Sequence, residues 1–287
     1  MAIPLHAGLR EVIAGYDALI LDLWGVVHDG LTPYDGAIDC LVRLAAAGKR
    51  VVILSNAPRR AHHAAARLDD MAIGADLYSA IVTSGEATRQ ALARRDEPWC
   101  RALGKRFFHL GKKADADLLD GLDYRGAARL EDADFLLATG PREDPAGDDA
   151  ILRAAAAQAL PMVCANPDLA VIRGGRREPC AGAYAARYES LGGLVHRLGK
   201  PHAGVYEPCL EALDGIERGR ILAVGDSLAT DIIGAQGVGL PSLLVTGGLL
   251  ADAWGIGRAT PPDPMRLEAA CRDAGATPTA AIPAFVW

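Results

Sequence analysis

The chain has 287 residues, of which 51% are hydrophobic and 23% are charged, and its formal net charge is -6. This composition is typical of a globular protein with a large apolar core, and the length favours two lobes. The acidic balance argues against nucleic-acid binding, because phosphate backbones bind clustered basic side chains and here only short pairs such as Arg59-Arg60 occur.

Eight short apolar runs rich in Val, Ile and Leu predict strands. They are apolar throughout instead of alternating with polar residues, which is typical of a parallel sheet covered on both faces. The runs span residues 18–23, 50–54, 80–83, 107–110, 135–138, 161–164, 221–224 and 242–245.

Stretches with helical spacing of apolar residues separate these runs and predict helices over residues 38–47, 86–94, 148–159, 181–191 and 205–213. The first of them stops at Gly48, a residue suited to a helix end. Strand and helix therefore alternate along most of the chain, and the fold class is α/β. Loops are expected at 173–175 and 260–264, and no element is predicted for the tail 277–287.

The N-terminus lacks a basic segment followed by an apolar one, and no run of 18 apolar residues occurs. We therefore expect no membrane segment and a cytoplasmic location. The six cysteines show neither C-x-x-C spacing nor clustering with histidine, which favours buried free thiols over a zinc site or disulfides.

Three predicted strands end in polar residues: Asp22, the pair Ser55-Asn56, and Gly225-Asp226-Ser227. Ligands of open α/β sheets bind outside the carboxyl ends of the strands, so we expect these three tips to converge. Two tips come early in the sequence and one comes late. The simplest arrangement is a core sheet built from both ends of the chain, with the middle inserted as a second lobe.

Asp22 is a candidate nucleophile, since a carboxylate at a strand end can form an acyl phosphate. Ser55 and Asn56 are candidates to bind a phosphate with their side chains and backbone N–H groups. Taken alone, a helix N-cap or a turn explains Asp22 better, and helix capping explains Ser55 and Asn56 at least as well.

Lys200 precedes a proline, and its ammonium could neutralise a carboxylate and a phosphoryl oxygen together, although a lone lysine is more often a surface residue. Asp226 and Asp231 straddle a predicted strand-to-helix turn and form a hard oxygen site suited to Mg²⁺. Asp231 is also a candidate helix N-cap.

These motifs, in this order, resemble the haloacid dehalogenase-like (HAD) hydrolase superfamily, and more closely its class IIA branch, the NagD or nitrophenylphosphatase type. The resemblance covers roughly residues 15–250. Further matching segments are Pro-Tyr-Asp-Gly-Ala at 33–37, Thr-Ser-Gly-Glu-Ala-Thr at 83–88, His-Leu-Gly at 109–111, Ala-Asn-Pro-Asp at 165–168, Cys-Ala-Gly-Ala-Tyr at 180–184 and Val-Thr-Gly-Gly at 245–248.

The resemblance implies a Rossmann-like core of residues 1–83 and 184–287, with an α/β cap of residues 84–183 inserted after the third strand. It also implies roles for the candidate residues. The Mg²⁺ ligands would be Asp22, the backbone carbonyl of Trp24 and Asp226, with Asp231 orienting the ion. Ser55 and Asn56 would hold the phosphoryl group, and Lys200 would neutralise charge.

Trp24 departs from the pattern, because phosphatases of this type carry at this position an Asp that acts as general acid and base. The indole N–H cannot exchange a proton usefully at neutral pH. Losing such a group typically costs about two to four decades of rate. His28, Asp29 or a cap residue could substitute, although a turn or capping role is favoured for the two named residues.

Three functions follow from these residues. The first is a Mg²⁺-dependent phosphatase that hydrolyses a small phosphorylated metabolite through an aspartyl-phosphate on Asp22, with an altered acid/base step. The second is a module that binds a phospho-ligand or a protein with little turnover. The third is a metal-independent dehalogenase, which the metal-type motif at 225–231 disfavours. A homodimer through an exposed face of the cap is possible in any of these cases.

Overall fold

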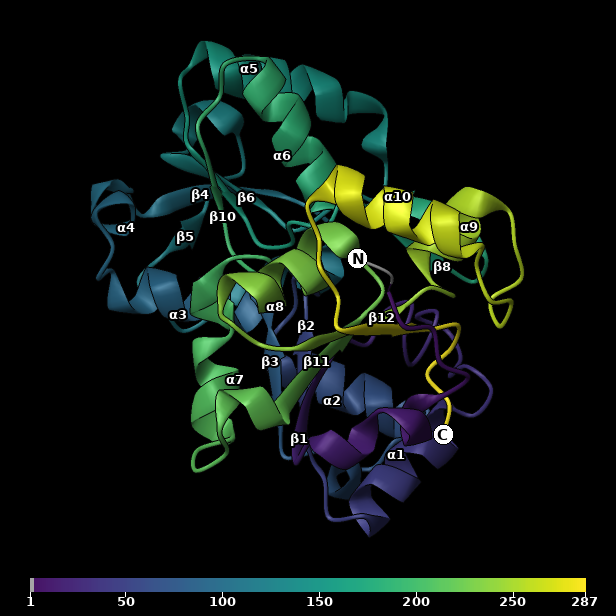
Figure 1. Cartoon of the computed structure of the whole chain (residues 1–287). Coiled ribbons are helices and arrows are strands. Elements are labelled where there is room, and N and C mark those ends of the chain that lie inside the picture. Colours follow the sequence, from purple (N-terminus) through teal and green to yellow (C-terminus); the bar gives the residue numbers. More distant parts are fainter. Residues whose placement is uncertain (1–2) are drawn as a thin grey trace.

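The structure is a computed structural model that describes residues 3–287, and its central sheet has six strands in the order β13-β12-β11-β1-β2-β3 (Figure 1). Every pairing in this sheet is parallel. Its strands come from both ends of the chain, as expected from the polar strand tips. They are β1 (Ala18–Leu21), β2 (Arg50–Ser55), β3 (Ala80–Thr83), β11 (Ile221–Gly225), β12 (Ser242–Val245) and β13 (Ala280–Ile282).

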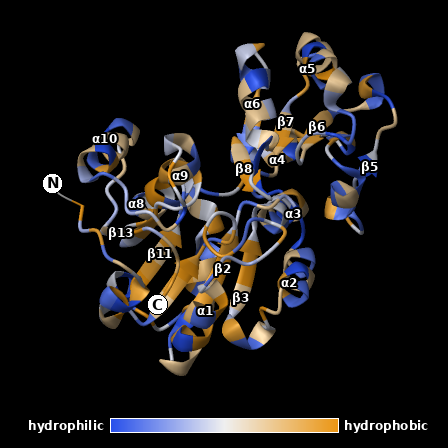
Figure 2. Cartoon of the chain, turned by 90° about the vertical axis from the view of Figure 1, so that its right-hand side faces the viewer, coloured by the Kyte–Doolittle hydropathy of each residue, from blue (hydrophilic) through white to orange (hydrophobic). Residues whose placement is uncertain are grey.

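Both faces of this sheet are buried, which explains why the strand sequences are apolar throughout. In β1, Leu19 and Leu21 pack into one hydrophobic cluster, and Ala18 and Ile20 pack into another on the opposite face. Polar helix surfaces enclose the apolar strands on the outside (Figure 2). The helices of this core are α1 (Ala37–Ala46), α2 (Ala61–Asp70), α7 (Glu207–Ala212), α8 (Ile233–Gly237), α9 (Leu249–Trp254) and α10 (Pro264–Ala274).

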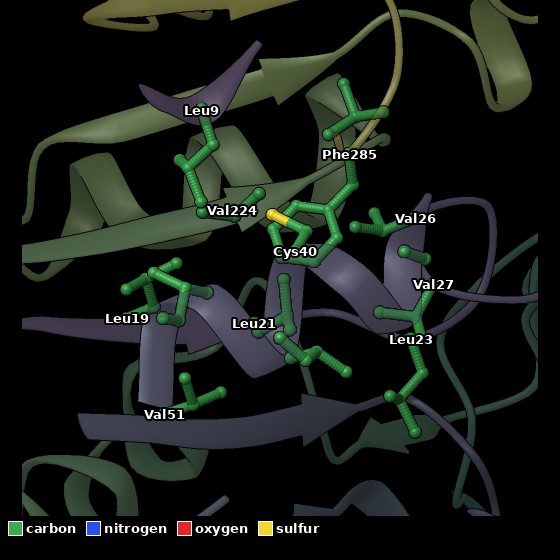
Figure 3. Close-up of a cluster of buried hydrophobic side chains, with 14 of the residues drawn as sticks. Leu9, Leu19, Leu21, Leu23, Val26, Val27, Cys40, Val51, Val224 and Phe285 are labelled. Carbon is green, nitrogen blue, oxygen red and sulfur yellow. The ribbon is translucent and has the colours of Figure 1, made fainter. Parts of the chain in front are cut away.

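The C-terminal tail, for which the sequence predicts no element, completes the core. It supplies β13 at the sheet edge and places the fully buried ring of Phe285 beside Cys40 and Val26 (Figure 3). The backbone N–H of Leu9 donates to the carbonyl of Val286, which ties the tail to the N-terminal segment. The two ends of the chain therefore pack into the same cluster.

The middle of the chain forms the cap, whose five-stranded parallel sheet has the order β10-β7-β6-β4-β5. The helix α3 (Ser84–Arg94) leads from β3 into the cap, and an antiparallel hairpin of β8 and β9 lies apart from the cap sheet. The remaining cap elements are α4 (Pro98–Ala102), β4 (Arg106–Leu110), β5 (Arg125–Gly126), β6 (Phe135–Ala138), α5 (Asp148–Ala157), β7 (Met162–Cys164), β8 (Ala170–Arg173), β9 (Arg176–Pro179), α6 (Ala181–Ser190) and β10 (Val195–Arg197).

Two elements after residue 183, where the resemblance implied the end of the cap, pack with the cap sheet. The strand β10 pairs with β7, and Ala185 and Tyr188 of α6 pack against Leu136 and Met162 of the cap sheet. We therefore propose that the cap extends from residue 84 to Arg197, because these two elements share its hydrophobic core.

The α/β class and the inserted cap are confirmed, and all eight predicted strands are present within two residues of their expected limits. The elements that were not predicted are short or polar, such as α2, whose only buried residue is Leu68. All six cysteines are buried and unbridged, as expected. Among residues 3–287, no helix has the length and hydrophobicity needed to cross a membrane.

Candidate active site

Three carboxylates meet at the carboxyl end of the central sheet. Asp22 and Asp226 follow the neighbouring strands β1 and β11, whose Leu21 and Val224 are directly paired. Asp231 lies in the π-helical turn that begins two residues after Asp226. The three side chains are each less than 10% exposed, and each offers an oxygen within 4.8 Å of the others. The last two carboxylates are five positions apart in sequence, and the turn brings them together.

Two glycines allow the backbone to approach Asp226 closely. A Cβ on Gly25 would lie 2.0 Å from Asp226 Oδ2, and one on Gly248 would lie 1.9 Å from the same atom. Gly25 also has a φ of +73°, which side chains rarely adopt. The backbone N–H of Leu249 donates to Asp226 Oδ2 at 2.8 Å. The chain is thus shaped around this carboxylate from two sides.

Lys200 lies between two of the carboxylates. Its Nζ is 2.7 Å from Asp22 Oδ1 and 2.6 Å from Asp231 Oδ1, and it donates to the carbonyl of Leu54 at 3.1 Å. Burial alone would lower the pKa of Lys200, but the two carboxylates outweigh burial and raise it. The ammonium therefore stays charged in the interior.

The cluster carries more negative than positive charge, because three carboxylates face one ammonium. Burial raises the pKa of Asp226 to about 7, and Asp231 adds to the shift. Burial and the neighbouring Asp231 and Asp226 also raise the pKa of Asp22, against the opposing effect of Lys200. A divalent cation among these oxygens would neutralise the excess negative charge, and hard carboxylate ligands suit Mg²⁺ or Ca²⁺. The donor set and its spacing fit such an ion.

Ser55 ends β2 and Asn56 follows it, beside this cluster. The Ser55 Oγ accepts from the N–H of Ala57 at 3.2 Å, so its own O–H can still donate. Asn56 accepts from the N–H of Lys200 at 2.8 Å, and its Nδ2 donates to Asp168 Oδ1 at 2.8 Å. The amide of Asn56 therefore connects the core, the Lys200 segment and the cap.

Trp24 is fixed from three directions. Its ring meets the His28 ring edge-on with centroids 5.3 Å apart, and the Arg173 guanidinium lies 4.9 Å from the ring centre. A Cβ on Gly30 would lie 2.1 Å from the indole, so only glycine fits there. Cation–π contact with Arg173 ties the indole to the β8–β9 hairpin of the cap.

A cavity of about 180 Å³ lies between the core and the cap, next to Ser55 and Trp24. This volume is below the range typical of drug-sized ligands, so the cavity suits a small molecule. Four basic side chains line it: Arg59, Arg67, Lys112 and Arg173. Three carboxylates also line it, Asp115, Asp168 and Glu178, and the first and last of them pair with Arg59 and Arg173. Four basic against three acidic side chains leave a small positive balance, which suits an anion.

Comparison with known proteins identifies the family. Residues 19–125 match the family described as haloacid dehalogenase-like hydrolase, and residues 197–267 match a related HAD-hydrolase-like family. D-glycerol 3-phosphate phosphatase of Mycobacterium tuberculosis is 31% identical over 86% of this chain and 67% of its own length. The chain belongs to the haloacid dehalogenase-like hydrolases. Human chronophin is 30% identical, with 85% of each chain covered.

Solved structures of HAD-like hydrolases have the same fold. A haloacid dehalogenase-like hydrolase from Brucella suis is 32% identical and superposes with a TM-score of 0.81, covering 98% of this chain and 100% of that one. The glycerol phosphate phosphatase of Mycobacterium tuberculosis, solved in complex with magnesium, is 27% identical with a TM-score of 0.63 and covers 88% and 76%. The resemblance to the HAD superfamily is thereby confirmed.

His28 and Asp29 stabilise the turn after Trp24. They are the two residues that the sequence offered as substitutes for the acid/base Asp of HAD-like hydrolases. His28 Nδ1 accepts from the N–H of Gly30 at 3.0 Å, and burial lowers the pKa of His28 to about 4. Asp29 Oδ1 accepts from the N–H groups of Leu31 and Thr32. Both therefore have the turn role that the sequence favours.

One carboxylate near this HAD site was not predicted. Asp168, in the segment Ala-Asn-Pro-Asp, is bonded to Asn56 and comes just before the cap hairpin. The sequence around Asp168 predicts only a loop, because its contact with Asn56 joins the cap to the core and leaves no local pattern. In the sequence, only the match of residues 165–168 to the HAD pattern points to this residue.

Proposed function

We propose that the chain is a Mg²⁺-dependent phosphatase that hydrolyses a small phosphorylated metabolite. The observation that carries this proposal is the buried cluster of Asp22, Asp226, Asp231 and Lys200 at the tip of the sheet. The phosphatases among the relatives and the magnesium complex of one of them support it. The basic lining of the adjacent cavity suits a phosphate ester.

In this proposal Asp22 attacks phosphorus and forms an aspartyl-phosphate, which water then hydrolyses. The O–H of Ser55 and the backbone N–H groups at the tip of β2 hold phosphoryl oxygens, with Asn56 fixing that tip. Lys200 neutralises negative charge beside the nucleophile.

Asp22, the carbonyl of Trp24 and Asp226 would hold the ion, and Asp231 would orient it. When bound, Mg²⁺ supplies positive charge to the phosphoryl oxygens. Catalysis of this kind depends mostly on positioning and electrostatics, so a tryptophan at residue 24 is compatible with it.

The test is phosphate release from 4-nitrophenyl phosphate and glycerol 3-phosphate, measured with Mg²⁺ and with EDTA. We expect release with Mg²⁺ and its loss with EDTA. Trp24 is the one observation that favours a binding module with little turnover, and absence of release together with retained binding of inorganic phosphate would support that alternative. Metal-independent halide release from a haloacid would instead indicate a dehalogenase.

Mg²⁺ affinity should increase as the pH rises through about 7. Asp226 has a pKa raised to about 7 by burial, so below that pH a proton competes with the ion for its carboxylate. For one competing proton, we expect binding to be about ten-fold weaker at pH 6 than at pH 8. Calorimetric titration with MgCl₂ at the two pH values measures this ratio. Equal affinities would contradict it, and Asp226→Asn should weaken binding at both.

A further inference from the structure

Asp168 lies where two hollows of the site meet. The larger is the 180 Å³ cavity, and the smaller is a recess lined by Asp22, Asp226 and Lys200. Among the described residues, only Trp24, Asp168 and Val171 line both hollows. Of these three, only Asp168 can give up or take up a proton. Among the described residues, it is therefore the one ionisable side chain that borders both the recess of the carboxylate cluster and the larger cavity.

The other protonatable groups of the larger cavity border only that cavity, and most are already bonded. His63 Nε2 lies 2.6 Å from Asp117 Oδ2, and Glu178 lies 3.3 Å from Arg173. His28 and Asp115 are held by Gly30 and Arg59, respectively. Lys112 also lines only the larger cavity.

The Asp168 carboxyl is held in a defined position. Its Oδ1 accepts from Asn56 Nδ2 at 2.8 Å, and Asn56 in turn accepts from the N–H of Lys200. Burial raises the pKa of Asp168, and Asp231 adds to this, while Lys200 and Asn56 oppose it. A raised pKa favours the protonated form that a general acid needs, and the hydrogen bond from Asn56 holds the carboxyl in place.

We propose that Asp168 performs the proton transfers that Trp24 cannot perform, an assignment that rests on the proposed phosphatase function. In the first step an Asp22 oxygen bonds to phosphorus and the bond from phosphorus to the leaving oxygen breaks. The leaving oxygen keeps the electron pair and takes the proton of the Asp168 carboxylic acid, giving an alcohol and a carboxylate.

In the second step the Asp168 carboxylate takes a proton from water while the water oxygen bonds to phosphorus. The bond from phosphorus to Asp22 breaks, which gives inorganic phosphate, a free Asp22 carboxylate and the protonated acid again. The cap thus supplies the proton donor and acceptor that relatives of this type are expected to carry on the core strand.

The test compares a substrate that needs an acid with one that does not. From glycerol 3-phosphate the leaving group is a glycerol alkoxide unless an acid protonates it, whereas from 4-nitrophenyl phosphate it is the stabilised 4-nitrophenolate anion. With Mg²⁺, we expect Asp168→Asn to lower kcat/KM for glycerol 3-phosphate by about 100-fold or more and to change it little for 4-nitrophenyl phosphate. A burst of nitrophenol should also appear, because hydrolysis of the aspartyl-phosphate becomes slow.

A second variant separates catalysis from structure. Adding Trp24→Asp to Asp168→Asn returns a carboxyl to the core strand and should restore most of the loss for glycerol 3-phosphate. Asp168→Ser, which still offers an acceptor to Asn56, should show the same substrate dependence as Asp168→Asn. Asp149→Asn serves as the control, since this carboxylate lies on α5, outside both hollows.

Equal losses of kcat/KM for both substrates, with no rescue, would mean that Asp168 only holds Asn56 and would overturn the assignment. Failure of the proposed function is a different result, because wild-type protein would then release no phosphate from 4-nitrophenyl phosphate with Mg²⁺.

Discussion

Asp22→Asn is expected to lower Mg²⁺-dependent phosphate release by about 10⁴-fold or more, the scale seen when a covalent nucleophile is removed. The amide has nearly the shape of the carboxylate but cannot bond to phosphorus. It also removes one of the three carboxylates that surround the proposed ion position. The measurement is kcat/KM at saturating Mg²⁺ for 4-nitrophenyl phosphate. This substrate is used because its leaving group depends least on proton donation.

The control for this variant is Asp39→Asn, the same substitution on the exposed face of α1. Asp22→Asn should fold, because Lys200 keeps Asp231 as a partner and the excess of buried negative charge decreases. Its melting temperature without metal should therefore equal or exceed that of the wild type. Activity above about 1% of wild type in a folded variant would show that another group attacks phosphorus.

The core sheet could be predicted from sequence because its physical cause is local. A strand buried on both faces must be apolar at consecutive positions, and β1 shows this with four buried residues in a row. The helix α2 was not predicted, because Leu68 is its only buried residue and the helix has no apolar stripe. The structure of the tail 277–287 was not predicted, because Phe285 packs against residues more than 240 positions earlier, such as Cys40.

The residues at the strand tips could also be predicted, since parallel strands deliver their carboxyl ends to one edge of the sheet. That rule brings Asp22 and Asp226 to one edge of the sheet without any knowledge of the cap, and the structure shows that their strands are neighbours. The contacts of Asp168 with Asn56 and of Arg173 with Trp24 could not be predicted, because they join the cap to the core. These contacts depend on how the core and the cap pack together, and no local sequence pattern predicts that packing.

Lys200→Met is expected to cost about 3 to 5 kcal/mol of unfolding free energy in metal-free protein at pH 8, since it removes the cation between two buried carboxylates. The loss should be smaller at pH 5, because the pKa of Asp22 is already raised by burial and proton uptake removes part of the uncompensated charge. Urea denaturation at both pH values measures the difference. Lys113→Met, at an exposed lysine of the cap, is the matched control.

The same substitution should lower kcat/KM by about 10² to 10³-fold with saturating Mg²⁺, in the range found when one preorganised charge-stabilising group is lost. The ion can replace the lysine in balancing the carboxylates, so Mg²⁺ should recover much of the stability. It cannot replace an ammonium beside the attacking oxygen, so activity should stay low. Recovery of both together would show that Lys200 serves only to balance charge, whereas recovery of stability alone places it in the chemistry at Asp22.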